Sequence, residues 1–141
     1  MGMRRKLLER LQAALPDIAR QLGIAACELT PVPGEAPVVE IAFSGGERLP
    51  IYVTDAGAQL LCIVYLWRES DLKPRSRGKL LDALLELNPS VPLSSFGRIG
   101  EHYILFGSLN RKATPDDLVV EITTLSENAG DALATLGSYL R

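Results

Sequence analysis

The strongest constraint on this fold is a helix signal that follows directly on an apolar strand near the end of the sequence. Thr114, Pro115, Asp116 and Asp117 are consecutive. Threonine suits the N-cap, proline suits the first helical position, and the two aspartates favour the positive end of the helix dipole. A helix is therefore predicted to begin here. Apolar residues then recur at spacings of four and three, at Leu118, Ile122, Leu125, Ala129, Ala132, Leu136 and Tyr139. Such a seam must pack against a sheet or another helix.

The composition is typical of a folded globular chain. Of 141 residues, 47% are hydrophobic and 23% are charged, and we expect one α+β domain over residues 1–141. A chain of this length can bury a core without a disulfide or a metal. Cys27 and Cys62 lie among apolar residues, so both are expected to be reduced and buried.

The charge and hydropathy patterns exclude some classes of protein. The sequence has neither a run long enough to cross a bilayer nor the apolar core of a signal peptide, so a cytoplasmic protein is expected. A net charge of −2 argues against bulk binding of nucleic acid.

Hydrophobic periodicity predicts the other elements. Helical spacing covers residues 3–22, where Pro16 indicates either a kink or two helical pieces, and a second helix is predicted over residues 77–87. Strands are predicted over residues 27–30, 38–43, 48–53, 59–67, 95–99 and 103–109, the first of them weakly. Pro50 favours an edge position or a bulge for its strand, whereas the continuous apolar run 59–67 predicts a central strand covered on both faces.

The order of these elements predicts the fold class. A helix, three or four strands, a second helix, two strands and a final helix follow one another without strand-helix-strand alternation. This order favours an α+β fold, with helices packed on a twisted antiparallel sheet of about five to six strands.

No residue pattern indicates catalysis. His102 is the only histidine, lacks companion ligands at metal-site spacing, and is expected to be a solvated residue near a turn. Ser-x-x-Lys occurs at residues 70–73 and 76–79, but the companion signatures of serine hydrolases of that type are absent. We therefore expect no catalytic residues, no metal and no cofactor, and the chain is predicted not to be an enzyme.

Basic residues gather around the start of the second predicted helix. Positive charge opposes the helix dipole at this end, so the cluster fits an acidic partner or anionic lipid headgroups, with a solvated linker as the plainer explanation. Trp67 precedes the cluster and is expected in the core or at an interface. The candidate partner-binding residues are Trp67, Arg68, Lys73, Arg75, Arg77 and Lys79.

Two glycines interrupt the final helix. Gly130 and Gly137 each cost about 1 kcal/mol relative to alanine in a helix interior. This cost suggests close approach of another backbone, although tolerance near the end of the helix is a comparable explanation. With Leu133, these glycines form the candidate contact of a homodimer.

The segment from His102 to Arg141 resembles the C-terminal part of the YjfI family of small bacterial proteins. The matching residues are Leu105-Phe106-Gly107-Ser108-Leu109 at the strand end, the run 119–128 with its Val-x-Glu-Ile start, and the closing Leu-x-x-Tyr-Leu at 136–140. Genes of that family often lie beside genes for relatives of phage shock protein A. The resemblance therefore implies a role in envelope stress or membrane maintenance, without a mechanism.

The element order also resembles that of type III secretion chaperones and YbjN-like domains, which dimerise and bind other polypeptides. We therefore predict a non-enzymatic adaptor or chaperone-like module, dimeric, with a protein partner. The alternative is a peripheral module that binds anionic lipid through Arg4, Arg5, Lys6 and the segment 73–79.

Overall fold

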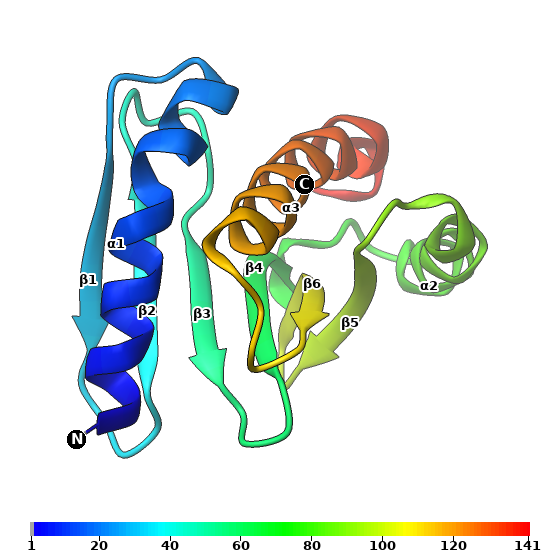
Figure 1. The fold of residues 1–141 in the computed structure, drawn as a ribbon. Coiled ribbons are helices and arrows are strands. Elements are labelled where there is room, and N and C mark those ends of the chain that lie inside the picture. The colour runs from blue at the N-terminus through cyan, green and yellow to red at the C-terminus, as the bar shows by residue number, and fades with distance from the viewer. Residues whose placement is uncertain (1) are drawn as a thin grey trace.

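The computed structural model describes residues 2–141 as three α-helices, six β-strands and short 3₁₀ turns (Figure 1). The main elements are α1 (Gly2–Leu22), β1 (Cys27–Val32), β2 (Val38–Phe43), β3 (Ile51–Asp55), β4 (Leu60–Arg68), α2 (Arg77–Leu87), β5 (Ser95–Ile99), β6 (His102–Leu109) and α3 (Pro115–Leu136). The 3₁₀ turns are η1 (Glu69–Asp71), η2 (Asn88–Ser90) and η3 (Gly137–Tyr139). The expected order of elements is confirmed, with four strands before α2.

All six strands form one sheet in the spatial order β1-β2-β3-β4-β6-β5, and each neighbouring pair is antiparallel. The chain runs through β1 to β4 as successive hairpins. It then crosses through α2 to the edge strand β5, and β6 returns between β5 and β4. Gly45 and Gly46 make the tight β2–β3 connection with φ of 95° and 71°, a left-handed backbone that glycine adopts at little cost. The predicted antiparallel α+β fold is confirmed.

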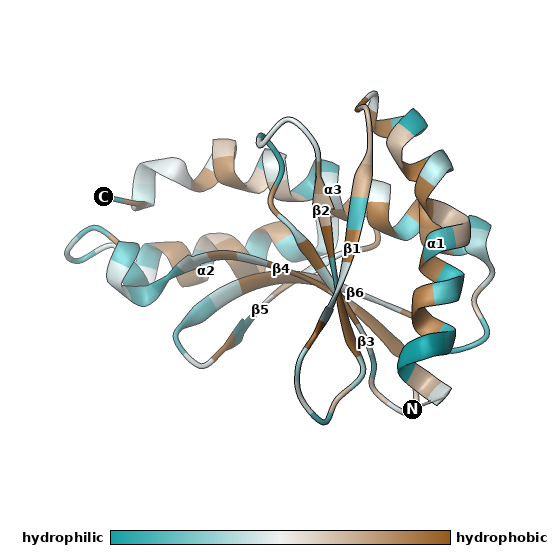
Figure 2. Cartoon of the chain, turned by 90° about the vertical axis from the view of Figure 1, so that its left-hand side faces the viewer, coloured by the Kyte–Doolittle hydropathy of each residue, from teal (hydrophilic) through white to brown (hydrophobic). Residues whose placement is uncertain are grey.

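Helices α1 and α3 cover one face of this sheet. α1 packs against β1, β2 and β3, α3 packs against β4 and β6, and the two helices contact each other (Figure 1). Alternate strand residues point into this layer, and Val39, Ile41, Val53, Cys62 and Val64 are fully buried. Figure 2 shows apolar colouring along the strands and alternating apolar and polar bands along α1. Each fully buried aliphatic side chain of this core contributes about 1.5–3 kcal/mol.

The opposite face of the sheet has no helix over it in residues 2–141, which corrects one expectation. β4 is central, as predicted, but only one of its faces is covered. Leu60 is fully buried, whereas Leu61 and Ile63 on the other face are half-buried and Tyr65 is 38% exposed. A continuous apolar run is found in a strand that is covered on both faces, but also in a strand whose side chains on the uncovered face pack against those of neighbouring strands. The sequence alone does not distinguish the two.

The structure settles the effect of two prolines, Pro50 at the start of β3 and Pro16 in α1, on the bounds of these elements. β3 begins at Ile51 and not at residue 48, because Pro50 has no amide hydrogen to donate to the ladder. α1 is one continuous helix through Pro16, so the reading as two helical pieces is wrong. The sheet does contain a bulge, but it interrupts β4 between Tyr65 and Trp67.

This bulge directs Trp67 into a second apolar cluster. It shifts the alternation of side chains by one residue, so the indole lies on the helix-covered face and is only 5% exposed. Trp67 stacks on Tyr103, with ring centroids 5.9 Å apart and ring planes at 29°. The other buried members of this cluster come from the residue after η1, from α2 and from α3: Leu72, Leu80, Leu84, Ala132 and Leu136.

The predicted start of α3 is confirmed in atomic detail. The Asp117 amide donates to Thr114 Oγ1 at 3.2 Å, and the Thr114 amide donates to Asp117 Oδ2 at 2.9 Å. The helix ends at Leu136, and Tyr139 of the apolar seam lies in η3. The Lys73 amide donates to the Tyr139 carbonyl at 2.9 Å, so the C-terminal residues hold the segment that follows β4.

One carboxyl group is buried between α3 and the sheet. Glu121 is 3% exposed, and its Oε2 has no hydrogen-bond partner among residues 2–141. Gly107 makes room for it, because a Cβ at that position would lie 2.1 Å from Glu121 Oε2. Burial raises the pKa of Glu121 to about 7. Both residues belong to the segments that carry the resemblance stated above, and in the fold they meet.

Glu121 should make the stability of the protein depend on pH. The neutral acid is favoured in the folded chain, so folding takes up a proton between the ordinary pKa of 4.5 and about 7. The free energy of unfolding should therefore fall by up to about 3 kcal/mol as pH rises through this interval, and then level off. Urea unfolding from pH 4.5 to 8 measures this slope. Glu121→Gln should flatten it, and Glu86→Gln on the exposed side of α2 should not. A wild-type stability that does not change over this range would contradict a neutral, buried Glu121.

Candidate functional site

An apolar groove lies between α2 and the edge strand β5. It encloses a cavity of about 360 Å³. Its lining residues come from α2, η2, β5 and β6: Arg77, Leu81, Leu84, Leu85, Asn88, Phe96, Gly97, Arg98 and Tyr103. The volume falls within the range of about 300–1,000 Å³ that is typical of binding pockets.

The leucines of α2 explain why this groove is apolar. Leu80 and Leu84 point into the second core cluster, where they are 0% and 6% exposed. Leu81 is half-buried and Leu85 is 71% exposed, so the apolar surface of α2 is wider than the part that its own core covers. α2 therefore presents apolar side chains toward β5 and solvent as well as toward the core.

The wall opposite α2 is the free edge of the sheet. β5 pairs only with β6, so its other edge carries backbone groups that no strand of residues 2–141 satisfies. One of these groups is capped: the Phe96 amide donates to Asn88 Oδ1 at 2.7 Å. This bond ties η2 to the edge of β5 and closes one end of the groove.

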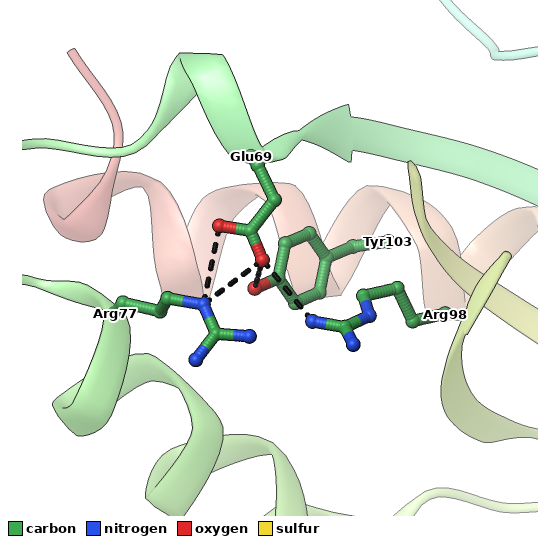
Figure 3. Close-up of polar contacts among 4 residues, drawn as sticks. All are labelled: Glu69, Arg77, Arg98 and Tyr103. Atoms are coloured by element: carbon green, nitrogen blue, oxygen red, sulfur yellow. Dashed lines mark hydrogen bonds and ion pairs between the residues drawn. The ribbon is translucent and has the colours of Figure 1, made fainter. Parts of the chain in front are cut away.

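The other end of the groove is lined by Arg77 and Arg98, whose contacts with Glu69 are drawn in Figure 3. Glu69, which directly follows β4, accepts hydrogen bonds from Arg77 Nε at 3.0 Å, Arg98 Nη1 at 3.3 Å and the Tyr103 hydroxyl at 2.6 Å. The Glu69, Arg77 and Arg98 side chains are 30%, 53% and 46% exposed. Pairs this exposed add little to stability, so their effect is mainly to orient the two guanidinium groups.

The protonation state of this cluster follows from its geometry. The hydrogen bond from the Tyr103 hydroxyl lowers the pKa of Glu69, against partial desolvation, and Arg77 and Arg98 add to the effect. Glu69 is therefore a carboxylate at neutral pH. Two guanidinium groups face this single carboxylate, so the end of the groove keeps an excess of positive charge.

The structure places the predicted partner-binding residues in different surroundings. Arg77 lines the groove, and Arg68 Nε lies 3.2 Å from His102 Nε2 on the neighbouring strand. Lys73, Arg75 and Lys79 are exposed around the start of α2. His102 is half-buried beside Tyr65, with ring centroids 5.3 Å apart.

Trp67 requires a correction as a partner contact. It is almost wholly covered by Tyr103 and the helices, so it supports the groove from inside and offers no surface to a partner. The sequence did not predict Glu69, Arg98 or Tyr103 as site residues. They lie on separate elements, and only the antiparallel pairing of β5 with β6 places Arg98 opposite Tyr103.

Of the candidate dimer residues, Gly130 and Leu133 lie in α3, whereas Gly137 follows the last residue of α3 and begins η3, so it does not interrupt the helix as predicted. Gly130 is exposed and Gly137 and Leu133 are half-buried. A Cβ added to either glycine would meet nothing within 4 Å, so the packing of the described chain does not require glycine at these positions.

The basic residues of α1 lie far from those of α2, because β1 and β5 are opposite edges of the sheet (Figure 1). Arg4 donates to the Gly34 and Ala36 carbonyls at 2.8 and 2.6 Å, and Arg5 lies 3.5 Å from Glu9. The two basic segments therefore do not form one continuous face.

Residues 2–141 contain neither a membrane-spanning helix nor a cluster of metal ligands. No helix there is both long and apolar enough to span a bilayer. No group of three or more His, Cys, Asp or Glu residues is arranged to hold a metal ion. Cys27 and Cys62 are free thiols, half-buried and buried respectively.

Tyr103→Phe tests the geometry of the charged end of the groove. The variant removes the hydroxyl that donates to Glu69, so the pKa of Glu69 should rise toward its ordinary value, and the protein should lose about 1 kcal/mol of stability. Carboxyl ¹³C NMR titration and urea unfolding measure the two effects. Tyr52→Phe is the matched control, because it removes a similar bond to Glu40 of 2.8 Å on the far face. An unchanged Glu69 titration in Tyr103→Phe would refute the arrangement.

Comparison with solved structures confirms the fold expected from the order of elements. The chain is similar to a chain in the HopA1–SchA chaperone–effector complex, with a TM-score of 0.53 and 19% identity, over 84% of this chain and 88% of the other. It also matches a chain of the heterodimeric ExoU–SpcU complex from the type III secretion system of Pseudomonas aeruginosa, with a TM-score of 0.49 and 17% identity, over 84% and 93% of the two chains. The first match supports a secretion-chaperone-like fold.

Sequence comparison identifies the relatives. The chain is 38% identical over 60 residues to the uncharacterized protein YjfI of Escherichia coli K12, and the match spans 40% of this chain and 45% of that protein. The same values hold for YjfI of Escherichia coli O157:H7. The matched region is thus less than half of these relatives. A family model described as "Uncharacterized protein conserved in bacteria (DUF2170)" matches residues 6–140, almost the whole chain. The chain belongs to the DUF2170 family.

Proposed function

We propose that this protein is a non-enzymatic adaptor that holds a segment of another protein in the groove between α2 and β5. The observation that carries this proposal is the apolar groove with two oriented arginines at one end. A fixed cation pair beside apolar side chains suits recognition of a peptide.

The chemistry of the groove defines its occupant as an acidic, apolar segment. Leu81, Leu85 and Phe96 offer apolar contact, and Arg77 and Arg98 offer forked donors that match a carboxylate. Three more exposed basic residues lie within four residues of Arg77 in the sequence: Lys73, Arg75 and Lys79. The positive charge that attracts an acidic segment therefore extends beyond the groove. An aspartate or glutamate of the partner would take the arginines' remaining donors.

The similarity of fold supports a protein partner. The structure matched with a TM-score of 0.53 is a chaperone–effector complex. That similarity concerns the fold, since only 19% of residues are identical, and the choice of binding surface comes from this chain's own groove.

A finer proposal concerns the cellular setting. The family resemblance supports a role in the response to envelope stress, with a relative of phage shock protein A as the partner, and we propose that the protein acts in the cytoplasm. The contact with lipid headgroups that the sequence also suggested would need the basic residues of α1 and α2 to act separately, since they lie at opposite edges of the sheet.

Removing the charge or the apolar surface of the groove should weaken binding. A peptide array that tiles the phage shock protein A relative supplies candidate segments, and fluorescence anisotropy measures their affinity. Segments with apolar residues beside Asp or Glu should bind. The double variant Arg77→Gln, Arg98→Gln and the variant Leu85→Asp should each lose at least about tenfold in affinity, a loss of about 1.4 kcal/mol.

Control variants distinguish the effect of substitutions in the groove from the effect of charge changes elsewhere on the surface. Arg5→Gln with Arg20→Gln removes two exposed arginines of α1, and Val120→Asp adds a charge at an apolar residue of α3 that is 51% exposed. Both should bind as the wild type does. Equal affinity of the groove variants and these controls would refute the groove as the binding surface.

We also propose that the protein forms a homodimer through the outer surface of α3 around Gly130, Leu133 and Gly137. The support is that glycine weakens a helix while nothing in residues 2–141 crowds Gly130, so the residue leaves space for a neighbouring molecule. A second copy of the chain is the proposed neighbour.

Gly130→Gln tests the dimer. Glutamine favours a helix, so the monomer should fold at least as stably, whereas the larger side chain should weaken the dimer at least about tenfold, a loss of about 1.4 kcal/mol. Analytical ultracentrifugation over a range of concentrations measures the dimer dissociation constant. Gly78→Gln in α2 is the control, since a Cβ there also meets nothing within 4 Å. A monomer at every concentration, or equal dissociation constants for the two variants, would contradict this dimer.

A further inference from the structure

A second cavity lies beside the ends of the inner strands β3, β4 and β6, apart from the α2–β5 groove. It occupies about 470 Å³ where the start of α1 meets the β3–β4 turn and the β6–α3 connection. Its lining residues are Met3, Lys6, Leu7, Arg10, Asp55, Ala58, Asn110, Arg111 and Lys112. Three segments that are distant in sequence thus build one site.

The cavity carries a strong excess of positive charge. Four of its lining residues, Lys6, Arg10, Arg111 and Lys112, are basic and only Asp55 is acidic, which leaves an excess of three positive charges. This excess contrasts with the net charge of −2 of the whole chain. Like charges gathered in one cavity repel one another, and a bound anion would relieve that repulsion.

The two arginines of the cavity are fixed by bonds within the protein. Arg10 donates to the carbonyls of Arg111, at 2.7 Å, and Ala113. Arg111 Nη2 lies 3.1 Å from Asp55 Oδ2. These bonds hold the β6–α3 connection against α1 and the β3–β4 turn. The walls of the cavity are therefore fixed by contacts within the fold.

The single carboxylate of the cavity, Asp55, is already paired with groups of the protein. Partial burial alone would raise the pKa of Asp55, but the Gly57 amide and the Arg111 guanidinium together hold it below its ordinary value. Asp55 is therefore ionised at neutral pH, and its charge is directed at Arg111.

The two lysines are the groups left to hold a ligand. Within residues 2–141, neither the Lys6 nor the Lys112 ammonium takes part in a hydrogen bond or an ion pair, and both residues are exposed. They come from α1 and from the β6–α3 connection, and so approach the cavity from two elements. Met3 and Leu7 add apolar surface to the lining.

We propose that this cavity binds a small ligand that carries a phosphate group. Lys6 and Lys112 hold the phosphate oxygens, the positive field of Arg10 and Arg111 adds to the attraction, and Met3 and Leu7 contact the apolar remainder of the ligand. A multiply charged anion fits an excess of three positive charges better than a single carboxylate does. The cavity volume is that of a small-molecule site.

The phosphate group could belong to a soluble ester or to a lipid headgroup. The site does not depend on the proposed protein-binding groove, because the two share no lining residue, so either can fail without the other.

The test uses the full chain and isothermal titration calorimetry with inorganic pyrophosphate and with phenyl phosphate, at low and at physiological salt. Both probes should bind, more weakly at higher salt. Lys6→Gln with Lys112→Gln should weaken binding at least about tenfold. Arg5→Gln with Arg20→Gln removes the same charge from exposed residues of α1 that do not line the cavity, and should leave the affinity unchanged. Because all four substituted residues are exposed, each double variant should keep the wild-type thermal midpoint.

Flotation with phosphatidylcholine vesicles, with and without phosphatidic acid, identifies the source of the phosphate. Binding of phosphatidic acid vesicles that Lys6→Gln with Lys112→Gln abolishes supports the site with a lipid headgroup as ligand. Binding of the soluble probes alone supports it with a soluble ester. The proposal is overturned if neither soluble probe nor vesicle binds, or if the two double variants bind equally well.

Discussion

The apolar seam of α3 is the contact on which the rest of the fold depends. Its first half, from Leu118 to Ala129, packs with α1 and the central strands, and its last turns, at Ala132 and Leu136, pack with α2 and Trp67. Among the helices of residues 2–141, α1 contributes buried residues to the first cluster alone and α2 to the second alone. The C-terminal turn then holds the segment after β4 through the Tyr139 carbonyl, so the start of α2 is positioned by the end of the chain.

The groove between α2 and β5 is a consequence of this arrangement. α2 is held to the body mainly through Leu80 and Leu84, while Leu85 faces outward at the free edge of the sheet. The bulge in β4 turns Trp67 inward against Tyr103, and the hydroxyl of Tyr103 then reaches Glu69. That carboxylate orients Arg77 and Arg98. A packing irregularity in one strand thereby supports the polar geometry of a surface site.

Local chemistry accounts for the elements that could be predicted. The N-cap at Thr114, and the strands β2 and β5, were each evident from a few neighbouring residues. The predictions were wrong where burial or position depended on residues distant in the sequence. The run through Leu61 and Ile63 suggested cover on both faces, but no second layer forms over it in residues 2–141. The role of Trp67 depended on a bulge that no local signal marks.

By itself, the sequence determined the order and most boundaries of the elements, the antiparallel α+β class and the family resemblance, because periodicity, caps and turns act over a few residues. Only the tertiary structure decided which charges meet. Arg77 was noticed as part of a basic cluster, but its partner Glu69 lies in η1 directly after β4, and Arg98, which pairs with the same carboxylate, lies in β5. Likewise Lys6 and Lys112 share a cavity only because α1 packs beside the connection from β6 to α3. Sites of this kind depend on the strand order β4-β6-β5 and on helix packing, and the physical reason is that long-range contacts leave no periodic trace in a single sequence.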